Sequence, residues 1–279
     1  MAYDDYEVLE QIAKGTRSAV YRARDRRSGR LVALKRLGDD SGFQEWEREV
    51  IALEKISSPN VVQLHESGRL NHGGYLALEW IEGQTLEAKA AQQRLSLDDF
   101  ALVASCLLHA LYSVHQAQFL HRDVTPANLM QASDRTWKLI DFGQARLLGA
   151  GSQQPLVGSV HCMAPEQFEN GTLDERTDFY ALGCTLHFAL TGSFAHMGET
   201  TAEVIASHLH PEPSRLAQIR PDLPPSAVAW VGWLMSRRPA DRPQSSWEAE
   251  NKLMSATVDT TSPRASLRSL TEHGEVAKW

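Results

Sequence analysis

The first part of the chain alternates apolar and polar residues with a period of about two. Between Tyr6 and about Leu37 many of the apolar positions are β-branched or aromatic, and Gly15 and Ser28-Gly29 interrupt the pattern. Such alternation is typical of strands with one buried face, and the glycines mark turns. The segment therefore predicts the strands of a twisted antiparallel sheet.

The spacing then changes to that of a helix. Apolar residues recur every three or four positions over residues 43–56, and Pro59-Asn60 follows shortly afterwards. This pattern predicts a helix that ends before the proline. Strand-like segments at 61–64 and 75–78 come next. The chain up to this point predicts a small β-rich lobe with one helix.

After Gly83 the apolar spacing is mostly helical. Ser96 with Asp99 is typical of a capping box and predicts the start of a helix over 100–115. Further helices are predicted at three later positions, near 178–190, 203–208 and 226–235. The second part of the chain therefore predicts a larger, mainly helical lobe.

The most apolar stretch, residues 100–114, is interrupted by Ser105 and His109 and is too short to span a bilayer. We therefore expect a buried core helix and no membrane span. Beyond about Leu253 the apolar spacing gives way to Ser, Thr, Asp and Arg, which predicts a flexible tail. Autophosphorylation sites in this tail and ordinary disordered composition explain its serines and threonines equally well.

The composition narrows the functional classes. The 279 residues include 35 acidic and 28 basic side chains, which give a net charge of −7. Such a chain is not expected to bind nucleic acid or anionic lipid through its general surface. Because the N-terminus carries acids where a signal would carry basic residues, and the three cysteines are widely spaced, we expect a reduced, cytoplasmic setting.

Two short motifs carry candidate chemistry. His121-Arg122-Asp123 is followed by Asn128, and Asp141-Phe142-Gly143 follows a strand-like segment at 137–140. Phosphoryl transfer needs a base for the acceptor hydroxyl, oxygen ligands for Mg²⁺ and cations on the phosphates. Either tripeptide alone arises by chance, but both in this order, beside the further markers below, favour phosphoryl transfer.

With these motifs, residues 6 to 250 resemble the eukaryotic-type (Hanks-type) Ser/Thr protein kinases, including their compact bacterial members. The resemblance implies an α+β bilobal protein-kinase fold that uses ATP and Mg²⁺. It implies that Asp123 orients and deprotonates the acceptor hydroxyl and that Asn128 and Asp141 bind magnesium. The implied divisions are a nucleotide-binding N-lobe at 1–79, a hinge at 80–83, a catalytic C-lobe at 84–253 and a tail at 254–279.

Val32-Ala33-Leu34-Lys35 resembles the third strand of the family, whose lysine holds the α- and β-phosphates and pairs with a helix carboxylate. Lys35 is therefore the expected cation. Among the glutamates of the following helix, Glu49 fits the family position best when counted back from Pro59. Glu45 lies one turn away on the same face and is an alternative partner.

The expected nucleotide site combines the glycine-rich loop, the sheet and the hinge. The loop keeps only Gly15, because Ala13 and Ser18 replace the flanking glycines, which suggests a stiffer loop or a weaker hold on the nucleotide. Lys14 and Arg17 are expected to face solvent. The predicted nucleotide-binding residues are Ile12, Ala13, Gly15, Ser18, Val20, Ala33, Lys35, Leu78, Glu79, Ile81 and Met130.

A third set of markers distinguishes protein kinases from small-molecule kinases. The segment 158–166 resembles the end of the family's activation loop, and the resemblance implies an ion pair between Glu166 and Arg242. Asp178 resembles the buried aspartate that anchors the backbone of the catalytic loop. These features favour a protein substrate over a small molecule.

Thr125 is the main departure from the family pattern, because Ser/Thr-specific members place a lysine there beside the γ-phosphate. Losing such a charge costs about 10²–10³ in rate by analogy with deletion of an oxyanion-hole donor. Pro126 and Ser159 still resemble the Ser/Thr class. Three hypotheses remain, from the most to the least favoured: an active protein kinase, a nucleotide-binding pseudokinase scaffold and a small-molecule kinase.

Regulation and partners are less defined by the sequence. Arg122 could receive a phosphate on Ser152, and a loop that is ordered without phosphorylation is equally consistent. Protein substrates with Ser or Thr acceptors and a possible regulatory partner are expected, and the oligomeric state is left open.

Overall fold

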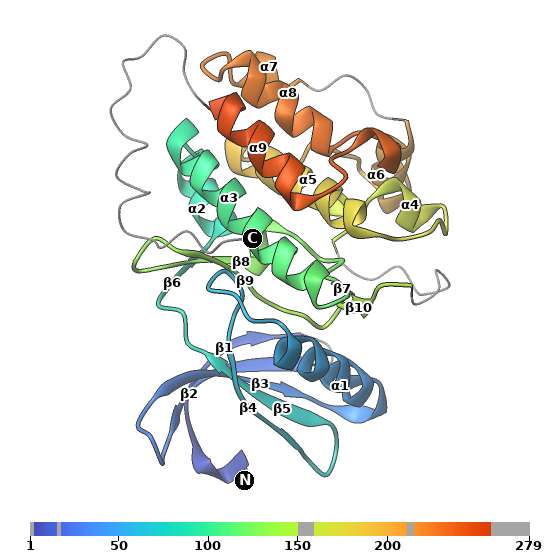
Figure 1. Ribbon diagram of the computed structural model, residues 1–279. Helices are drawn as coiled ribbons and strands as arrows, with labels where there is room; N and C mark the ends of the chain where they lie inside the picture. The colour runs from blue at the N-terminus through green and yellow to red at the C-terminus, as the bar shows by residue number, and fades with distance from the viewer. Residues whose placement is uncertain (1–2, 16–17, 150–158, 211–214, 258–279) are drawn as a thin grey trace.

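The computed structural model describes residues 3–15, 18–149, 159–210 and 215–257. A β-rich lobe and a helical lobe lie one above the other and are joined near residue 80 (Figure 1). The α+β bilobal fold expected from the sequence is confirmed.

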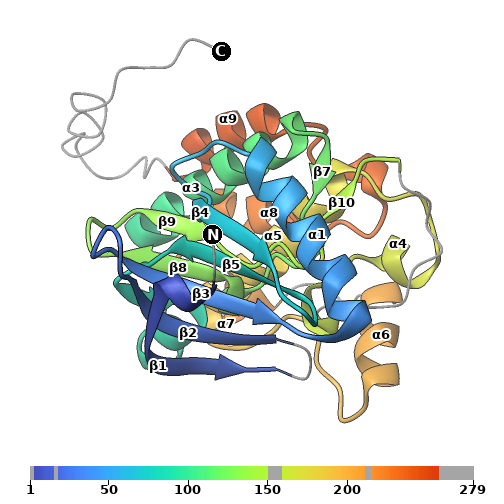
Figure 2. The same ribbon diagram turned by 90° about the horizontal axis from the view of Figure 1, so that it is seen from below.

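The small lobe is an antiparallel sheet with one long helix against it. Within the described residues the strand order is β1-β2-β3-β5-β4. The helix α1 lies beside β3, β4 and β5 (Figure 2). The bounds are β1 Tyr6–Lys14, β2 Ser18–Asp25, β3 Leu31–Leu37, α1 Asp39–Lys55, β4 Leu64–Arg69 and β5 Gly74–Glu79, after the 3₁₀ turn η1 Tyr3–Asp5.

Two details of this lobe differ from the sequence-based prediction. The helix α1 begins at Asp39, ahead of residue 43, because Gly38 already has an extended N-cap backbone. The strand predicted at 61–64 was wrong: β4 begins only at Leu64, and Val62 N–H donates instead to the Leu139 carbonyl at 3.0 Å. Asn60 Nδ2 also donates to the Trp137 carbonyl at 2.9 Å. Residues 60–62 therefore hold the chain segment that leads to Asp141.

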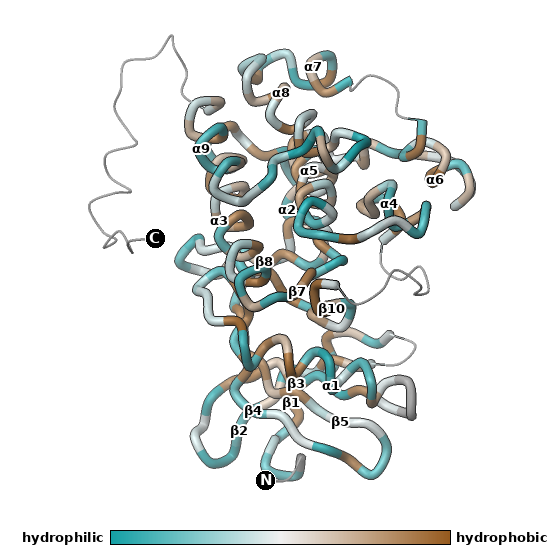
Figure 3. Tube along the Cα trace, turned by 45° about the vertical axis from the view of Figure 1, so that its right-hand side comes forward, coloured by the Kyte–Doolittle hydropathy of each residue, from teal (hydrophilic) through white to brown (hydrophobic). Residues whose placement is uncertain are grey.

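The helical lobe is built around α5, whose residues 177–191 are all buried. Figure 3 shows hydrophobic colours inside this lobe and hydrophilic colours on many of its outer turns. Its α-helices are α2 Leu86–Gln92, α3 Leu97–Gln116, α4 Pro165–Phe168, α5 Glu175–Thr191, α6 Thr201–Leu209, α7 Leu216–Ile219, α8 Pro225–Leu234 and α9 Ser246–Thr257. The short 3₁₀ helices are η2 Pro126–Asn128, η3 Val160–Cys162 and η4 Pro239–Asp241.

Among the described residues, five short strands of the second part of the chain form two small sheets. The strand β8 Leu129–Ala132 pairs with β6 Gly83–Thr85 and β9 Trp137–Leu139, and β7 Phe119–Leu120 pairs with β10 Arg146–Leu147. Gly83 allows the chain to pass from the hinge onto β8, because a Cβ there would lie 1.7 Å from the Gln131 carbonyl oxygen. A side chain at residue 83 would separate β6 from β8.

The helix α3 is longer than predicted. It begins at Leu97 because the Ser96 side chain caps it by accepting from the Asp99 N–H at 3.1 Å, and it runs for 20 residues. By length and composition alone α3 could cross a membrane, contrary to the expectation that this stretch is too short; half of its most apolar window is buried within the fold. It packs against α5 and α9. In this structure α3 therefore serves as a core helix.

The last described helix continues past the predicted end of the helical lobe. The helix α9 runs beyond Leu253 to Thr257, while residues 258–279, the rest of the predicted tail, lie outside the described residues. Leu253 and Ala256 are both buried.

Candidate active site

Lys35 links the two lobes through two carboxylates. Its Nζ donates to both oxygens of Glu49, at 2.9 and 2.7 Å, and to Oδ1 of Asp141 at 2.8 Å. The strand β3 provides the lysine, α1 provides Glu49, and Asp141 follows β9. The structure thus pairs Lys35 with Glu49 and not with the alternative, Glu45.

Burial dominates the electrostatics of this contact. Lys35 is 5% exposed and Glu49 is fully buried. Burial, together with the nearby charge of Asp141, raises the pKa of Glu49 to about 7, although Lys35 opposes the shift. Burial alone would lower the pKa of Lys35, but Glu49 and Asp141 raise it above its usual range. The lysine is therefore held charged between two acids.

Asp141 is the more accessible of these acids. Its side chain is 46% exposed, and Lys35 lowers its pKa, assisted by the Gly143 N–H, which donates to Oδ1 at 3.2 Å. Its φ of 61° lies in the left-handed region, a conformation that is uncommon for residues other than glycine. The carboxylate therefore stays ionised in a turn that points it toward Lys35.

The residues after Asp141 are held from both sides. Phe142 is fully buried, its N–H donates to Glu49 Oε1 at 3.3 Å, and its ring meets His121 edge to face at 4.7 Å. A Cβ at Gly143 would lie 2.7 Å from Oε1 of Glu45. Glu45 therefore faces this turn, which explains why it is not the partner of Lys35.

Asp178 fixes the backbone of the catalytic loop, as predicted. Its carboxylate accepts from the N–H groups of His121 at 3.0 Å and Arg122 at 2.8 Å, and from His115 Nε2 at 2.8 Å. Burial works to raise the pKa of Asp178, but these hydrogen bonds hold it below its usual range. Arg122 has a φ of 67°, so this anchor maintains an unfavourable turn just before Asp123.

Asp123 lies in the centre of a small polar network. Asn128 Nδ2 donates to Asp123 Oδ2 at 2.7 Å and to its carbonyl at 2.9 Å, and the Ser159 N–H donates to Oδ1 at 3.2 Å. Burial raises the pKa of Asp123, and the neighbouring His121 and Ser159 act against the shift. The carboxylate is thus oriented by two groups and kept more basic than an exposed aspartate.

The oxygen atoms near Asp141 fit a magnesium ion only in part. Asn128 directs its Nδ2 toward Asp123, which leaves Oδ1 as the ligand atom that it can offer. Together with the half-exposed carboxylate of Asp141 this makes two protein ligands. Mg²⁺ prefers six oxygens and commonly takes several from waters and substrate phosphates. The pair fits a cation that arrives with a nucleotide.

The predicted nucleotide-binding residues lie on facing strands. Cross-strand partners share one face of a sheet, and the register pairs Val20 with Lys35 and Ala33 with Leu78. On the other side, Met130 lies in β8 opposite Lys138. Ile81 is buried just before β6. Val20, Ala33 and Leu78 therefore lie on the same face of the sheet as Lys35.

The turn between β1 and β2 contains the remaining predicted residues. Ile12 and Ala13 are exposed on β1, and Gly15 N–H donates to the Ser18 carbonyl at 2.8 Å. A Cβ at Gly15 would meet Ser18 atoms only at 3.4 Å or more. Packing within the described residues therefore does not require a glycine at this position; residues 16 and 17, with Arg17, lie outside them.

Arginine side chains gather near the catalytic loop. Burial and the charges of Arg48 and Arg122 lower the pKa of Arg146 to about 10, with Glu45 acting in the opposite direction. Burial and Arg48 also lower the pKa of Arg122. This concentration of positive charge suits an anion. Ser152, whose phosphorylated side chain Arg122 could receive, lies outside the described residues.

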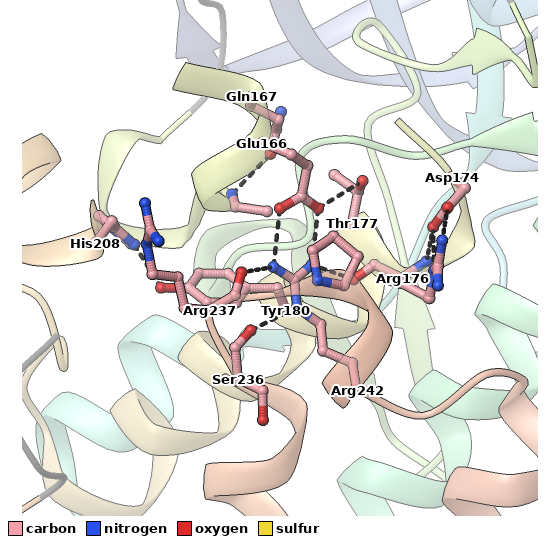
Figure 4. Close-up of polar contacts among 12 residues, drawn as sticks. Glu166, Gln167, Asp174, Arg176, Thr177, Tyr180, His208, Ser236, Arg237 and Arg242 are labelled. Atoms are coloured by element: carbon pink, nitrogen blue, oxygen red, sulfur yellow. Dashed lines mark hydrogen bonds and ion pairs between the residues drawn. The ribbon is translucent and has the colours of Figure 1, made fainter. Parts of the chain in front are cut away.

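The predicted pair of Glu166 and Arg242 is confirmed (Figure 4). Arg242 donates to both oxygens of Glu166, at 2.7 and 2.8 Å, and the Thr177 hydroxyl donates to Glu166 at 2.9 Å. Both charged side chains are buried. The pair fixes α4, at the end of the segment that begins with Ser159, to the centre of the helical lobe.

Thr125 lies between Asp123 and Asn128 in the sequence. It is 5% exposed, and its carbonyl accepts from the Asn128 N–H at 3.0 Å. Thr125 is therefore buried beside the catalytic loop. This is the position at which the sequence predicts a missing cation.

Sequence reasoning missed a group of ring side chains beneath η3. Tyr180, His196 and His208 come from separate segments and share hydrogen bonds. No spacing in the sequence relates them, because their contact depends on how α5, α6 and the connecting loop pack.

Comparison with known proteins gives one family. The family model described as the protein kinase domain matches residues 6–254. A protein of Corynebacterium efficiens named a probable serine/threonine-protein kinase is 32% identical over 94% of this chain and 43% of its own length. In Mycobacterium tuberculosis, the serine/threonine-protein kinase PknL is 31% identical over 85% of this chain and 62% of its own length. PknD of the same organism is 30% identical over 86% of this chain and 38% of its own length. The chain thus spans only part of the length of these relatives.

Proposed function

Because the chain belongs to the protein kinase domain family, we propose that it is a protein serine/threonine kinase that transfers the γ-phosphoryl group of MgATP to Ser or Thr hydroxyls of proteins. The proposal rests on two sets of contacts that occur together. Lys35 donates to Glu49 and Asp141, and Asp123 accepts from Asn128 and Ser159. Phosphoryl transfer depends on such positioning more than on covalent chemistry.

In this proposal Asp123 receives the proton of the acceptor hydroxyl. Burial raises its pKa, which makes it a better base than an exposed aspartate. The Asn128 and Ser159 contacts fix its two oxygens, so the carboxylate meets the acceptor in one orientation. Magnesium held by Asn128 and Asp141 would neutralise charge on the phosphates.

Lys35 has a separate role in the same proposal. The lysine would bind the α- and β-phosphates while Glu49 keeps its ammonium group in place. Asp141 is half exposed and accepts from Lys35 through one oxygen. Nucleotide and metal can therefore take over its contacts without disturbing the buried pair of Lys35 and Glu49.

The pseudokinase alternative rests on Thr125 and on the reduced glycine loop. The complete set of base, lysine, glutamate and metal-binding groups favours catalysis, because a scaffold needs none of the geometry around Asp123. A small-molecule kinase is less favoured, since Glu166 and Arg242 anchor a segment suited to a protein acceptor. The cytoplasmic location and a separate regulatory partner stay predictions.

The test is transfer from γ-labelled ATP, with Mg²⁺, to the chain itself and to myelin basic protein. We expect the wild type to transfer label and Asp123→Asn to lose it almost completely, because the amide cannot accept the proton. Asp98→Asn, an exposed aspartate on α3, is the matched control and should keep full activity.

Two results would contradict this proposal. Unchanged labelling in Asp123→Asn removes the assigned base. A wild type that transfers no label, yet melts at a higher temperature when ATP is present, supports the pseudokinase scaffold instead.

A further inference from the structure

Tyr180, His196 and His208 form a buried hydrogen-bonded cluster beneath η3. The Tyr180 hydroxyl contacts His196 Nε2 at 2.9 Å and His208 Nδ1 at 2.7 Å. The two imidazole rings are stacked with centroids 3.8 Å apart. The exposed fractions are 1% for Tyr180, 7% for His196 and 0% for His208.

This arrangement suits neutral imidazoles. The Tyr180 hydroxyl can donate to a nitrogen of one ring and accept from an N–H of the other. Two neutral rings, one acting as acceptor and one as donor, therefore suit the hydroxyl. Two protonated rings would repel each other at the stacking distance. Burial lowers the pKa of His196 to about 4 and that of His208 to about 3. The rings therefore hold the same contacts throughout the neutral pH range.

The cluster reaches the active site through η3. His161 Nδ1 donates to the His196 carbonyl at 2.9 Å, and the His161 ring stacks on Phe194 at 4.6 Å. The residue that precedes η3 is Ser159, whose N–H donates to Oδ1 of Asp123. A short, continuous path thus joins the ring cluster to the proposed catalytic base.

The other side of the cluster is fixed. The Arg242 guanidinium lies 4.8 Å from the centre of the Tyr180 ring, and Arg242 itself is locked to Glu166 (Figure 4). Phe168 packs against His208 at 5.5 Å. Tyr180 is therefore packed against a fixed ion pair, and the two histidines hydrogen-bond to its hydroxyl.

We propose that His196 and His208, acting through Tyr180 and His161, are positioning residues for the protein acceptor: they set the distance between η3 and Asp123. This inference rests on the proposed kinase function and concerns acceptor binding alone. Lys35, Glu49 and Asp141, the residues proposed to hold the nucleotide and its metal, contact one another and take no part in the hydrogen bonds described for the cluster.

The experiment compares the Michaelis constants for the acceptor and for ATP in the full chain, with myelin basic protein as acceptor. Tyr180→Phe removes the shared hydroxyl but keeps the ring over Arg242. We expect the KM for the acceptor to rise about five- to tenfold, because both buried hydrogen bonds of the Tyr180 hydroxyl are lost. The KM for ATP should stay within twofold, on the order of experimental error.

Conservative substitutions test the role of each nitrogen. The amide of asparagine can replace a histidine Nδ1, and that of glutamine can replace Nε2. His208→Ala and His196→Ala should therefore raise the KM for the acceptor. His208→Asn and His196→Gln should bring it most of the way back to the wild-type value. His210→Ala is the matched control, because His210 is exposed at the end of α6 and should leave both constants unchanged.

The outcomes separate the two proposals. If the wild type transfers label and the Phe and Ala variants fold but keep the acceptor KM, the positioning role is wrong. It is also wrong if the KM for ATP rises as much as that for the acceptor, since the cluster would then only stabilise the lobe. A wild type without transfer overturns the kinase function and, with it, this inference.

Discussion

Two buried cations, Lys35 and Arg242, each contact carboxylates but have very different surroundings. All five N–H donors of Arg242 are used: two go to Glu166, and the others go to the carbonyls of Ser236, Arg176 and Arg237. Lys35 instead divides its ammonium group between the buried Glu49 and the half-exposed Asp141. The arginine is saturated by the protein, whereas the lysine keeps one contact at the edge of the solvent.

This difference separates a structural ion pair from one available for chemistry. Replacing Arg242 would leave the buried Glu166 carboxylate without its ion partner. In the proposed mechanism Asp141, whose side chain is half exposed, would exchange Lys35 for a metal ion. We therefore expect equivalent substitutions to affect stability in one region and transfer in the other.

The largest effect is expected at the structural pair. Arg242→Met leaves the Glu166 carboxylate buried with only the Thr177 hydroxyl, and should lower the free energy of unfolding by about 3–5 kcal/mol. Urea denaturation measures the change. Arg237→Met removes the exposed contact with Glu169 and should cost roughly 1 kcal/mol or less. If Arg242→Met loses little unfolding free energy but abolishes phosphoryl transfer, Arg242 is not only a structural residue and the contrast with Lys35 is wrong.

At Lys35, replacement of the cation by methionine should mainly affect activity. Lys35→Met is expected to lower the rate of transfer about 10²–10³-fold, since a charge partner of the phosphates is lost. The cost in unfolding free energy should be smaller than for Arg242→Met, because Glu49, with a pKa of about 7, can take up a proton. Lys252→Met on the exposed face of α9 is the control. Steady-state kinetics and urea curves on the same samples test the contrast.

The smallest effect is a pH dependence centred on Glu49. As pH falls through about 7, protonation of Glu49 weakens its pairing with Lys35, so kcat/KM should fall by up to about tenfold per pH unit. The effect on stability has the opposite sign. A folded pKa above the unfolded value favours the folded state at low pH, and this contribution is lost as pH rises through 7.

Glu49→Gln separates this titration from that of Asp123. The amide still accepts from Lys35 but cannot ionise, so the limb near pH 7 should disappear from the pH profile of the remaining activity. If the limb near pH 7 persists in Glu49→Gln, another group causes it.

Much of the candidate site was predictable because the family motifs keep fixed spacing. Asp123, Asn128, Asp141 and Lys35 were identified from short motifs, and the structure brings them together; their catalytic roles stay predictions. Glu49 was preferred only by counting, and Glu45 remained open until the geometry placed it beside Gly143. Two residues one helical turn apart cannot be distinguished by period alone.

Other features could not be predicted. Val61 and Val62 have a strand-like pattern, but they form a bridge to Leu139 and not part of β4. The apolar alternation says which residues are buried and not which neighbour covers them. The same holds for the Tyr180 cluster. Its members are polar or aromatic residues on different elements, and no local preference favours their contact.

The sequence by itself determined the family, the bilobal fold and the order of the chemical groups, because these depend on local periodicity and on motifs only a few residues long. Only the tertiary structure decided which glutamate meets Lys35, how far Asp141 is exposed and which rings support η3. Those properties depend on distances between elements far apart in the chain, and such distances are set by the packing of the two lobes as a whole.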